Sequence, residues 1–342
     1  MSEFNLLVEK WIPVLYQNGE FTRLGIKKTL EDAHLIRQIA ASNPMDRVSV
    51  IRFLLAILYW CKGNPQEEDE FPSKFPLEWF KKLDENQECF NLLGDGKRFY
   101  QDEAVKNKDK LSVSSLIHEI PTGSNIYHFR HSLDGEDGLC PSCCALGLIR
   151  LPVFTTVGGR GNRPGINKKP PIYLLPFGKS LFETLKFTYK PVQNIGFPSW
   201  DYKEKVNNSD AEVPLLNGLT NLPRLVWLEE PTQIGKCINC GSYAPLIRKC
   251  VFNGGSDQND KIWHDPHIAI IDNKENKPIV ADNPLKIWFK TDRPWTNLLN
   301  YCSIYEQNLL GNFSVVGFAS DQAKHIDIWE RNLTSLSKVY LF

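Results

Sequence analysis

Two Cys-x-x-Cys pairs that lie far apart in the sequence are the strongest constraint on how this chain can fold. Cys140 and Cys143 form the first pair, and Cys237 and Cys240 form the second. Four thiolates in two such pairs are the usual ligand set of a closed, tetrahedral zinc site. If one ion binds both pairs, the two segments must meet, and the site would be structural because four protein ligands leave no open position.

The other cysteines support reduced thiols rather than a disulfide framework. The sequence contains nine cysteines, an odd number, and its N-terminus has no secretion signal. Four unrelated core thiols remain the alternative to a metal site. A zinc deaminase is excluded, because these enzymes combine a Pro-Cys-x-x-Cys pair with a His-x-Glu element, and the sequence has neither.

The composition is that of an ordinary globular chain without a dominant charge. Lysine plus arginine and aspartate plus glutamate number 40 each, so any nucleic-acid surface must be a local patch. The longest apolar run, residues 53–61, is too short to span a bilayer. We therefore expect a cytoplasmic location and no membrane partner.

Local patterns predict an irregular α+β fold, with helices early and mainly antiparallel strands late. Asn18-Gly19 between apolar runs predicts a hairpin over residues 11–24. Thr29 is the expected N-cap of a helix over residues 30–41. Asn43 and Pro44 predict the start of a second helix, which is apolar on nearly all sides and therefore buried.

The later part of the chain is expected to consist mainly of strands and loops. The turn at residues 272–276 predicts a hairpin over 268–281, and the Pro- and Asn-rich residues 190–218 are expected to form a loop. We expect one globular unit over residues 1–334, followed by a tail over 335–342.

A glycine loop with basic residues is the best candidate for contact with nucleic acid. Residues 158–190 contain seven lysines and arginines against one acid, Glu183. The loop lacks the Gly-Lys-Ser/Thr of a P-loop, so its glycines more plausibly allow close backbone approach to a groove. A plain solvated loop remains the alternative. The loop residues are Gly158, Gly159, Arg160, Gly161, Asn162 and Arg163.

Two histidine-containing segments are ambiguous. Residues 127–131 combine aromatic and basic side chains that suit stacking on unpaired bases, although simple loop packing explains the pattern too. The segment 263–267, with His264, Asp265 and His267, might suggest a metal site or an acid–base pair. No further group at a suggestive spacing joins it, so its histidines are interpreted as structural or interface residues. The sequence shows no Ser–His–Asp order, no paired-carboxylate motif and no nucleophile elbow. It therefore predicts a binding protein, not an enzyme.

An ordered series of segments resembles the CasA-like large subunits of type I-E Cascade, the CRISPR RNA-guided surveillance complex. The resemblance covers nearly the whole chain, and its strength is the order of the segments. The matching segments are residues 4–14, 43–58, 99–101, 140–145, 158–165, 222–227, 237–241, 263–266 and 316–318.

The resemblance implies a subunit that reads the protospacer-adjacent motif (PAM) of double-stranded target DNA and promotes strand separation and R-loop formation. It implies contact with the 5′ handle of the guide crRNA through a loop before the first cysteine pair. It further implies partnership with the backbone, crRNA-capping and small subunits of Cascade, and with a nuclease in trans.

The same resemblance assigns roles to particular residues. The handle-contacting residues would be Phe129, Arg130 and His131, and the glycine loop at residues 158–163 would approach the PAM minor groove. Asn253 lies near the position of the family's minor-groove lysine, with Lys249 as the fallback. Gln307 and Asn308 are the candidates for the strand-separating wedge.

One departure concerns the end of the chain. CasA-like chains continue beyond a segment like residues 316–333 into a C-terminal helical bundle, whereas this sequence ends at Phe342. We expect a compact form without the bundle, or a bundle supplied by another subunit. Two rival functions stay open: a zinc-stabilised nuclease or hydrolase using His264, Asp265 and His267, and a pure assembly scaffold of a ribonucleoprotein.

Overall fold

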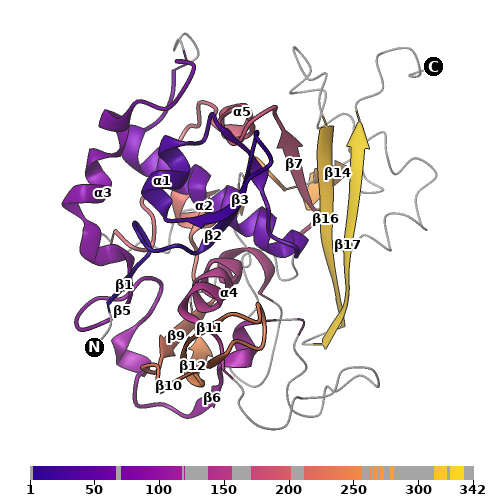
Figure 1. Cartoon of the computed structure of the whole chain (residues 1–342). Helices are drawn as coiled ribbons and strands as arrows, with labels where there is room; N and C mark the ends of the chain where they lie inside the picture. The colour runs from indigo at the N-terminus through magenta and orange to yellow at the C-terminus, as the bar shows by residue number, and fades with distance from the viewer. Residues whose placement is uncertain are drawn as a thin grey trace.

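The computed structural model shows an α+β body in which small sheets surround two central helices. It describes residues 3–66, 71–117, 119, 138–155, 171–201, 212–255, 262–263, 265–268, 270–272, 278–280, 312–321 and 324–334. The central helices are α2 (Pro44–Lys62) and α4 (Pro141–Phe154). In Figure 1 they occupy the middle of the body, and the sheets lie around them. The predicted fold class is confirmed.

The N-terminal sheet contains the predicted hairpin. Strand β2 (Ile12–Tyr16) pairs with β3 (Phe21–Leu24) on one side and with β4 (Ile36–Ile39) on the other, all antiparallel. Gly19 in the turn has a φ of 88°, a backbone conformation that favours glycine. The hairpin over residues 11–24 is therefore confirmed.

The expected helix over residues 30–41 is wrong. Helix α1 is shorter and earlier (Ile26–Glu31), and residues 36–39 form β4 instead. Gly25 is the N-cap, and a Cβ there would lie 2.5 Å from the carbonyl oxygen of Leu7. Thr29 lies inside the helix, where its hydroxyl donates to the Gly25 carbonyl. Strand pairing with β2 thus overrode the local helical pattern.

Helix α2 begins and ends at capping residues. The Asn43 side chain accepts a hydrogen bond from the Met45 amide at 2.8 Å, and Pro44 occupies the first turn. Most of the 19 residues are buried, as the sequence predicted, and the helix ends at Gly63, whose φ is 93°.

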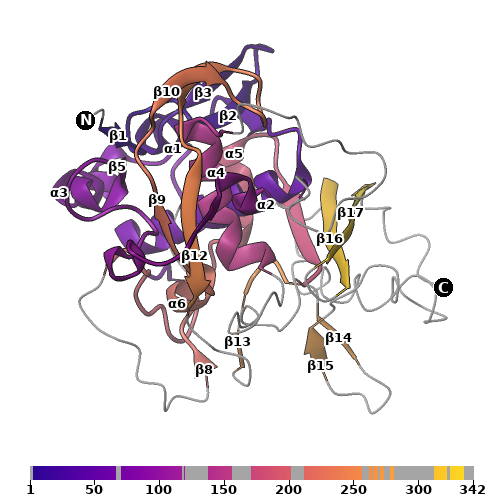
Figure 2. The same cartoon turned by 90° about the horizontal axis from the view of Figure 1, so that it is seen from below.

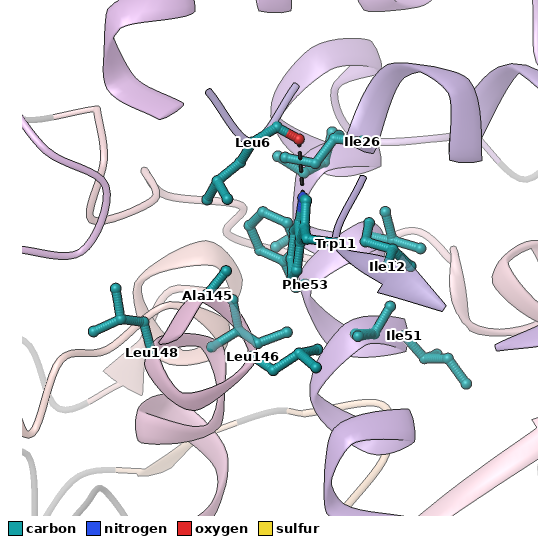
Figure 3. Close-up of a cluster of buried hydrophobic side chains, with 14 of the residues drawn as sticks. Leu6, Trp11, Ile12, Ile26, Ile51, Phe53, Ala145, Leu146 and Leu148 are labelled. Atoms are coloured by element: carbon teal, nitrogen blue, oxygen red, sulfur yellow. Dashed lines mark hydrogen bonds between the residues drawn. The ribbon is translucent and has the colours of Figure 1, made fainter. Parts of the chain in front are cut away.

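Helix α4 was not predicted, although it begins directly after the first cysteine of the Cys140 pair. Cys140 is its N-cap residue and Pro141 its first residue. The helix packs against α2 and is buried along most of its length. Figure 3 shows Ala145, Leu146 and Leu148 of α4 close to Ile51 and Phe53 of α2, in one cluster with Trp11.

Two three-stranded sheets flank the helices. One has the order β6 (Lys110–Ser112), β12 (Lys249–Gly254), β9 (Arg224–Leu228), and the other has the order β17 (Lys324–Thr334), β16 (Asn312–Asp321), β7 (Tyr173–Phe177). Figure 2 shows β9 and β12 on one side of α4 and β16 and β17 on the other.

The remaining elements are short. Strands β14 and β15 pair antiparallel and confirm the predicted hairpin at 268–281. The loop expected at 190–218 contains β8 and α6, while residues 202–211 lie outside the described residues. The bounds are β1 Phe4–Asn5, η1 Leu77–Phe80, α3 Lys81–Glu85, η2 Gln87–Phe90, β5 Asn91–Leu93, η3 Glu103–Val105, η4 Val113–Leu116, α5 Leu181–Thr188, β8 Glu212–Val213, α6 Leu215–Leu219, β10 Gln233–Lys236, β11 Tyr243–Leu246, β13 Ile262–Trp263, β14 Ile270–Asp272 and β15 Pro278–Val280. Among the helices of the described residues, none is long and apolar enough to cross a membrane.

Phe53 of α2 packs among other aromatic rings of the core. Its ring lies 6.1, 5.5 and 5.7 Å from the rings of Trp11, Phe99 and Trp200. We expect Phe53→Ala to lower the free energy of unfolding by about 3–5 kcal/mol, because it leaves a cavity among these rings. Urea unfolding measures this. The control Leu77→Ala, at a side chain that is 62% exposed, should change stability by less than about 0.5 kcal/mol.

Candidate metal centre

The four predicted cysteines converge into one compact group. The sulfur atoms of Cys140, Cys143, Cys237 and Cys240 all lie within 4.8 Å of one another. The Sγ atoms of Cys140 and Cys240 are 3.7 Å apart. Three of the four residues are buried, and Cys240 is half-buried. The interpretation of these residues as unrelated core thiols is therefore wrong.

Local structure explains how each pair presents its thiols. The first pair lies at the start of α4, where one helical turn brings Cys143 back beside Cys140. The second pair lies at the tip of the β10–β11 hairpin. Gly241, with a φ of 73°, allows the tight turn in which its amide donates to the Cys237 carbonyl at 2.9 Å.

Backbone contacts hold the two pairs together. Ile238 of the second pair donates its amide to the Gly138 carbonyl, just before the first pair, at 3.1 Å. Leu139 and Ile247 exchange two backbone hydrogen bonds, each of 2.9 Å. Main-chain hydrogen bonds, and not only the thiols, therefore hold the two cysteine pairs close together.

The donor set fits a soft divalent ion. Sulfur ligands about 2.3 Å from a tetrahedral Zn²⁺ are separated from one another by about 3.8 Å, close to the Cys140–Cys240 separation. The pKa of Cys237 is lowered to about 6, chiefly because the thiol of Cys140 hydrogen-bonds to its sulfur. The pKa of Cys240 is lowered by the same neighbour. The contacts among the four sulfurs raise the pKa of Cys143 and, on balance, that of Cys140, so Cys237 and Cys240 are the members that ionise first. Ionised thiols are the form that binds metal.

Other polar groups support these sulfurs. The Cys140 amide donates to the Cys237 sulfur at 3.3 Å, and the Asn239 side-chain amide donates to the Cys143 sulfur at 3.3 Å. Such outer contacts orient ligands and stabilise their charge. Cys144, next to the first pair, is buried outside the group of four, and burial raises its pKa. It is therefore a core thiol.

A buried ion-pair network connects α2, α4 and Glu119. Arg150 of α4, 1% exposed, donates from Nε to Asp46 of α2 at 2.6 Å. Its two terminal nitrogens donate to Glu119 at 2.7 and 3.2 Å. In the sequence, Glu119 precedes the loop that is predicted to contact the crRNA, and α4 ends at Phe154, before the predicted glycine loop. The network therefore joins α2, α4 and Glu119 through buried ion pairs.

A second pair joins α2 to the long β16–β17 hairpin. Arg47 donates to both carboxylate oxygens of Glu330 at 2.6 Å, and the Ser314 hydroxyl donates to the same carboxylate at 2.9 Å. Such charge-assisted hydrogen bonds are shorter and stronger than those between neutral groups. A groove of about 990 Å³ opens beside them, lined by residues of both charge signs that include Arg37, Lys179 and Glu183.

A third ion pair joins α2 to Asp265, in the segment between residues 263 and 267. Arg52 of α2 donates from Nε to Asp265 at 3.1 Å, and both side chains are almost fully buried. Burial alone would raise the pKa of Asp265, but the charge of Arg52 lowers it to about 2. The His267 amide donates to the same carboxylate at 2.7 Å. The arrangement is that of a structural anchor, because the carboxylate is paired and closed off from solvent.

The sequence patterns missed these ion pairs. Arg52 and Arg150 are isolated charges inside apolar helical segments. Since charged side chains are almost never fully buried unless paired, each could have been predicted to have a buried carboxylate partner. The identity of the partners was not predictable, because Asp265 is 213 residues from Arg52 in the sequence.

Some of the predicted site residues lie in the described part of the chain, and others lie outside it. Asn253 and Lys249 both lie on β12, four residues apart, which corresponds to about 13 Å along a strand. Asn253 is half-buried opposite Leu225, whereas Lys249 is exposed, so they occupy separate positions. The other predicted positions lie outside the described residues: Gly158, Gly159, Arg160, Gly161, Asn162, Arg163, Phe129, Arg130, His131, Gln307, Asn308 and His264.

Comparison with known proteins decides the family. The family model described as CRISPR-associated protein Cse1 matches residues 5–307. This chain belongs to the Cse1 family. The CasA/Cse1 protein of Thermus thermophilus is 27% identical to it over 210 residues, which are 56% of this chain and 40% of that protein. The match thus spans less than half the length of this curated relative.

Solved Cse1 and CasA structures share the fold of this Cse1-family chain. A crystal structure of Thermus thermophilus CasA has a TM-score of 0.72 at 20% identity, over 97% of this chain and 72% of that one. Thermobifida fusca Cse1 gives 0.72 at 17%, over 97% and 73%. A chain of a structure described as a CRISPR RNA-guided surveillance complex, pre-nicking, gives 0.74 at 16%, over 97% and 74%.

His267 should make the stability of the chain depend on pH. The side chain is fully buried, neither ring nitrogen has a hydrogen-bond partner among the described residues, and burial lowers the pKa of His267. The unfolded chain takes up a proton near pH 6.5 that the folded chain does not. The contribution of His267 to the free energy of unfolding is therefore complete above about pH 6.5, and it decreases as the pH falls below that value.

Urea unfolding at pH 7, 6 and 5 should show this decline, and His267→Gln should reduce its slope. The control Leu77→Ala, at an exposed side chain without a titratable group, should leave the slope as it is in the unmodified chain. Equal slopes in the His267→Gln variant and the unmodified chain would show that His267 takes up its proton as easily when folded.

Proposed function

We propose that this chain is the large subunit of an RNA-guided CRISPR surveillance complex, Cascade, and that it recognises the PAM of double-stranded target DNA. The observation that carries the proposal is the match to the Cse1 family over residues 5–307. It is supported by the shared fold with chains of two structures described as CRISPR RNA-guided surveillance complexes, at TM-scores of 0.74 and 0.70.

In this proposal the protein reads a short motif and the guide RNA reads the rest of the target. The glycine loop at residues 158–163 approaches the PAM minor groove, where the absence of side chains permits close contact. Asn253 and Lys249 are additional DNA contacts. Because the two are separated along β12, we do not expect both of them to contact a single base pair.

The neighbouring functions follow the same assignment. Phe129, Arg130 and His131 contact the crRNA 5′ handle, and Gln307 and Asn308 promote strand separation and R-loop formation. The partners are the crRNA, the target DNA and the other Cascade subunits, in the cytoplasm, with cleavage by a nuclease in trans. The Glu119–Arg150–Asp46 network supports this scheme, because it holds Glu119 and α4 against α2, and these two precede the crRNA-contacting and PAM-reading segments in the sequence.

The cofactor we propose is one structural Zn²⁺ bound by the four clustered cysteines. Four thiolate ligands complete a tetrahedral shell, so the ion would stabilise the fold and would not bind substrate. It would join the start of α4 to the tip of the β10–β11 hairpin.

We propose no catalytic residue for this chain. The rival nuclease or hydrolase would need His264, Asp265 and His267 at an accessible site. Asp265 and His267 are fully buried, and Asp265 is paired with Arg52. These facts favour the structural interpretation of the segment.

Metal analysis tests the zinc assignment. The purified chain should contain about one equivalent of zinc, and Cys140→Ser combined with Cys237→Ser should lose it and lower the melting temperature, because binding free energy contributes to folding. Cys61→Ser, at a cysteine outside the cluster, should retain the metal. A folded chain that contains no metal would contradict the assignment.

The PAM assignment is tested with the assembled complex. The chain, co-expressed with guide RNA and companion subunits, should bind a PAM-containing duplex, and Gly158→Trp combined with Gly161→Trp should weaken this binding at least about tenfold. The bulky rings would keep the backbone away from the groove. Leu77→Trp, at an exposed position, is the control.

The negative outcomes of these experiments lead to different conclusions. Unchanged duplex binding by the double glycine variant would favour the pure scaffold. A chain that co-purifies with neither guide RNA nor companion subunits would contradict membership of the complex.

A further inference from the structure

The β10–β11 hairpin carries an unusual apolar surface. Among the described residues, Tyr243 and Ile234 are the most exposed large hydrophobic side chains, at 78% and 76%. Both belong to this hairpin. Single exposed hydrophobic residues need no explanation, but neighbouring ones on a rigid element indicate an interaction surface.

The register of the hairpin places these side chains on one face. Ile234 pairs with Pro245, and Lys236 pairs with Tyr243. Directly paired residues, and residues two apart along a strand, project from the same side of a sheet. All four residues are exposed. We call this set, Ile234, Lys236, Tyr243 and Pro245, the outer face of the hairpin.

Most residues of the opposite face pack against the body of the protein. Gly235 and Leu246 are buried, and Ala244 is half-buried and packs against the hydrophobic core. The hairpin therefore has one face held by the body of the protein and one face that the described part of the chain leaves in solvent. Its exposure is not a consequence of a loosely attached segment.

The hairpin is also stiffened at both ends. Its tip contains two of the four clustered cysteines, and the Cys237 amide donates to the Ser242 carbonyl at 2.9 Å. At the other end, the Thr232 amide donates to Leu246 at 3.2 Å, and Ile247 exchanges backbone hydrogen bonds with Leu139. A surface held in one conformation before binding loses little entropy when a partner docks.

The hairpin carries basic charge, and the two acids just before it, Glu229 and Glu230, are paired with Lys110 and Arg98. Residues 231–255 contain no aspartate or glutamate, and their charged side chains are Lys236, Arg248 and Lys249. Lys236 lies on the outer face itself, paired with Tyr243, and Lys249 is exposed at the start of β12. A complementary partner would present carboxylates beside an apolar patch.

We propose that the outer face of the β10–β11 hairpin is a docking surface for a companion protein subunit of the surveillance complex. The partner contributes an apolar patch that covers Ile234 and Tyr243, and a carboxylate that pairs with Lys236. This inference rests on the proposed function, which supplies the companion subunits.

A protein partner fits this surface better than RNA does. Stacking on bases uses aromatic rings and arginine planes, and Tyr243 alone could serve in that way. Ile234 and Pro245 offer neither a π-face nor a hydrogen-bond donor. Burying Ile234 and Pro245 against apolar side chains of another protein is favourable. They would then form the apolar core of an interface, with Lys236 at its rim.

Assembly is the test. The chain is co-expressed with the companion subunits and guide RNA, and the complex is purified through a tag on the chain. Ile234→Ser combined with Tyr243→Ser should reduce the recovered companion protein at least about tenfold, since central apolar anchors dominate interface energy. Metal content and melting temperature should stay unchanged, because both side chains are exposed before assembly.

A matched control separates the surface from general exposure. Val8→Ser combined with Leu77→Ser removes side chains that are 66% and 62% exposed elsewhere on the chain, and should leave assembly intact. A carbodiimide gives a second readout. It activates a carboxylate of the companion subunit, the Lys236 amine forms an amide with it, and the urea by-product leaves. This cross-link should disappear in Lys236→Arg.

Three results would overturn the inference. Recovery of companion protein by the Ile234→Ser/Tyr243→Ser variant at the level of the unmodified chain would show that the outer face is not an interface. Loss of guide RNA with companion protein retained would assign the face to RNA instead. An unmodified chain that recruits no companion subunit would overturn the proposed function, and this inference with it.

Discussion

The pairing of buried charges along helix α2 is the constraint on which the rest of the structure depends. Asp46 and Arg52 are buried on this helix and Arg47 is half-buried, and a buried ion is tolerated only with a partner. Each partner comes from a different part of the chain: Arg150 in α4, Glu330 in β17 and Asp265 after β13. Removing one partner of a fully buried pair such as Arg52–Asp265 typically costs about 3–5 kcal/mol, so these contacts select one arrangement of the surrounding elements.

Helix α4 carries this arrangement to the candidate metal centre. Its first turn contributes Cys140 and Cys143, and Arg150 follows two to three turns later, facing Asp46 and Glu119. One rigid helix therefore links the cysteine cluster, the ion-pair network and the start of the predicted glycine loop. The exposed hairpin β10–β11 is attached to the same cluster. A metal ion there would stabilise an internal anchor and an external surface together.

Local sequence patterns succeeded where a single short-range rule controls the backbone. Asn18-Gly19 gave the hairpin of β2 and β3, and the Asn43-Pro44 cap gave the start of α2. The pattern failed at residues 30–41, because β4 pairs with β2 and the contact of Gly25 with Leu7 sets an earlier, shorter α1. Helix α4 was missed because a continuous apolar segment has no periodicity to distinguish helix from strand.

The sequence by itself determined which four cysteines cluster, the fold class and the family resemblance. Cysteine spacing is a local property, and a series of short motifs keeps its order whatever the chain does between them. Tertiary structure alone decided which charges pair, that Asp265 and His267 are enclosed rather than accessible, and that Ile234 and Tyr243 share an outward face. Those outcomes depend on contacts between residues far apart in the sequence, whose energies exist only after the core has packed.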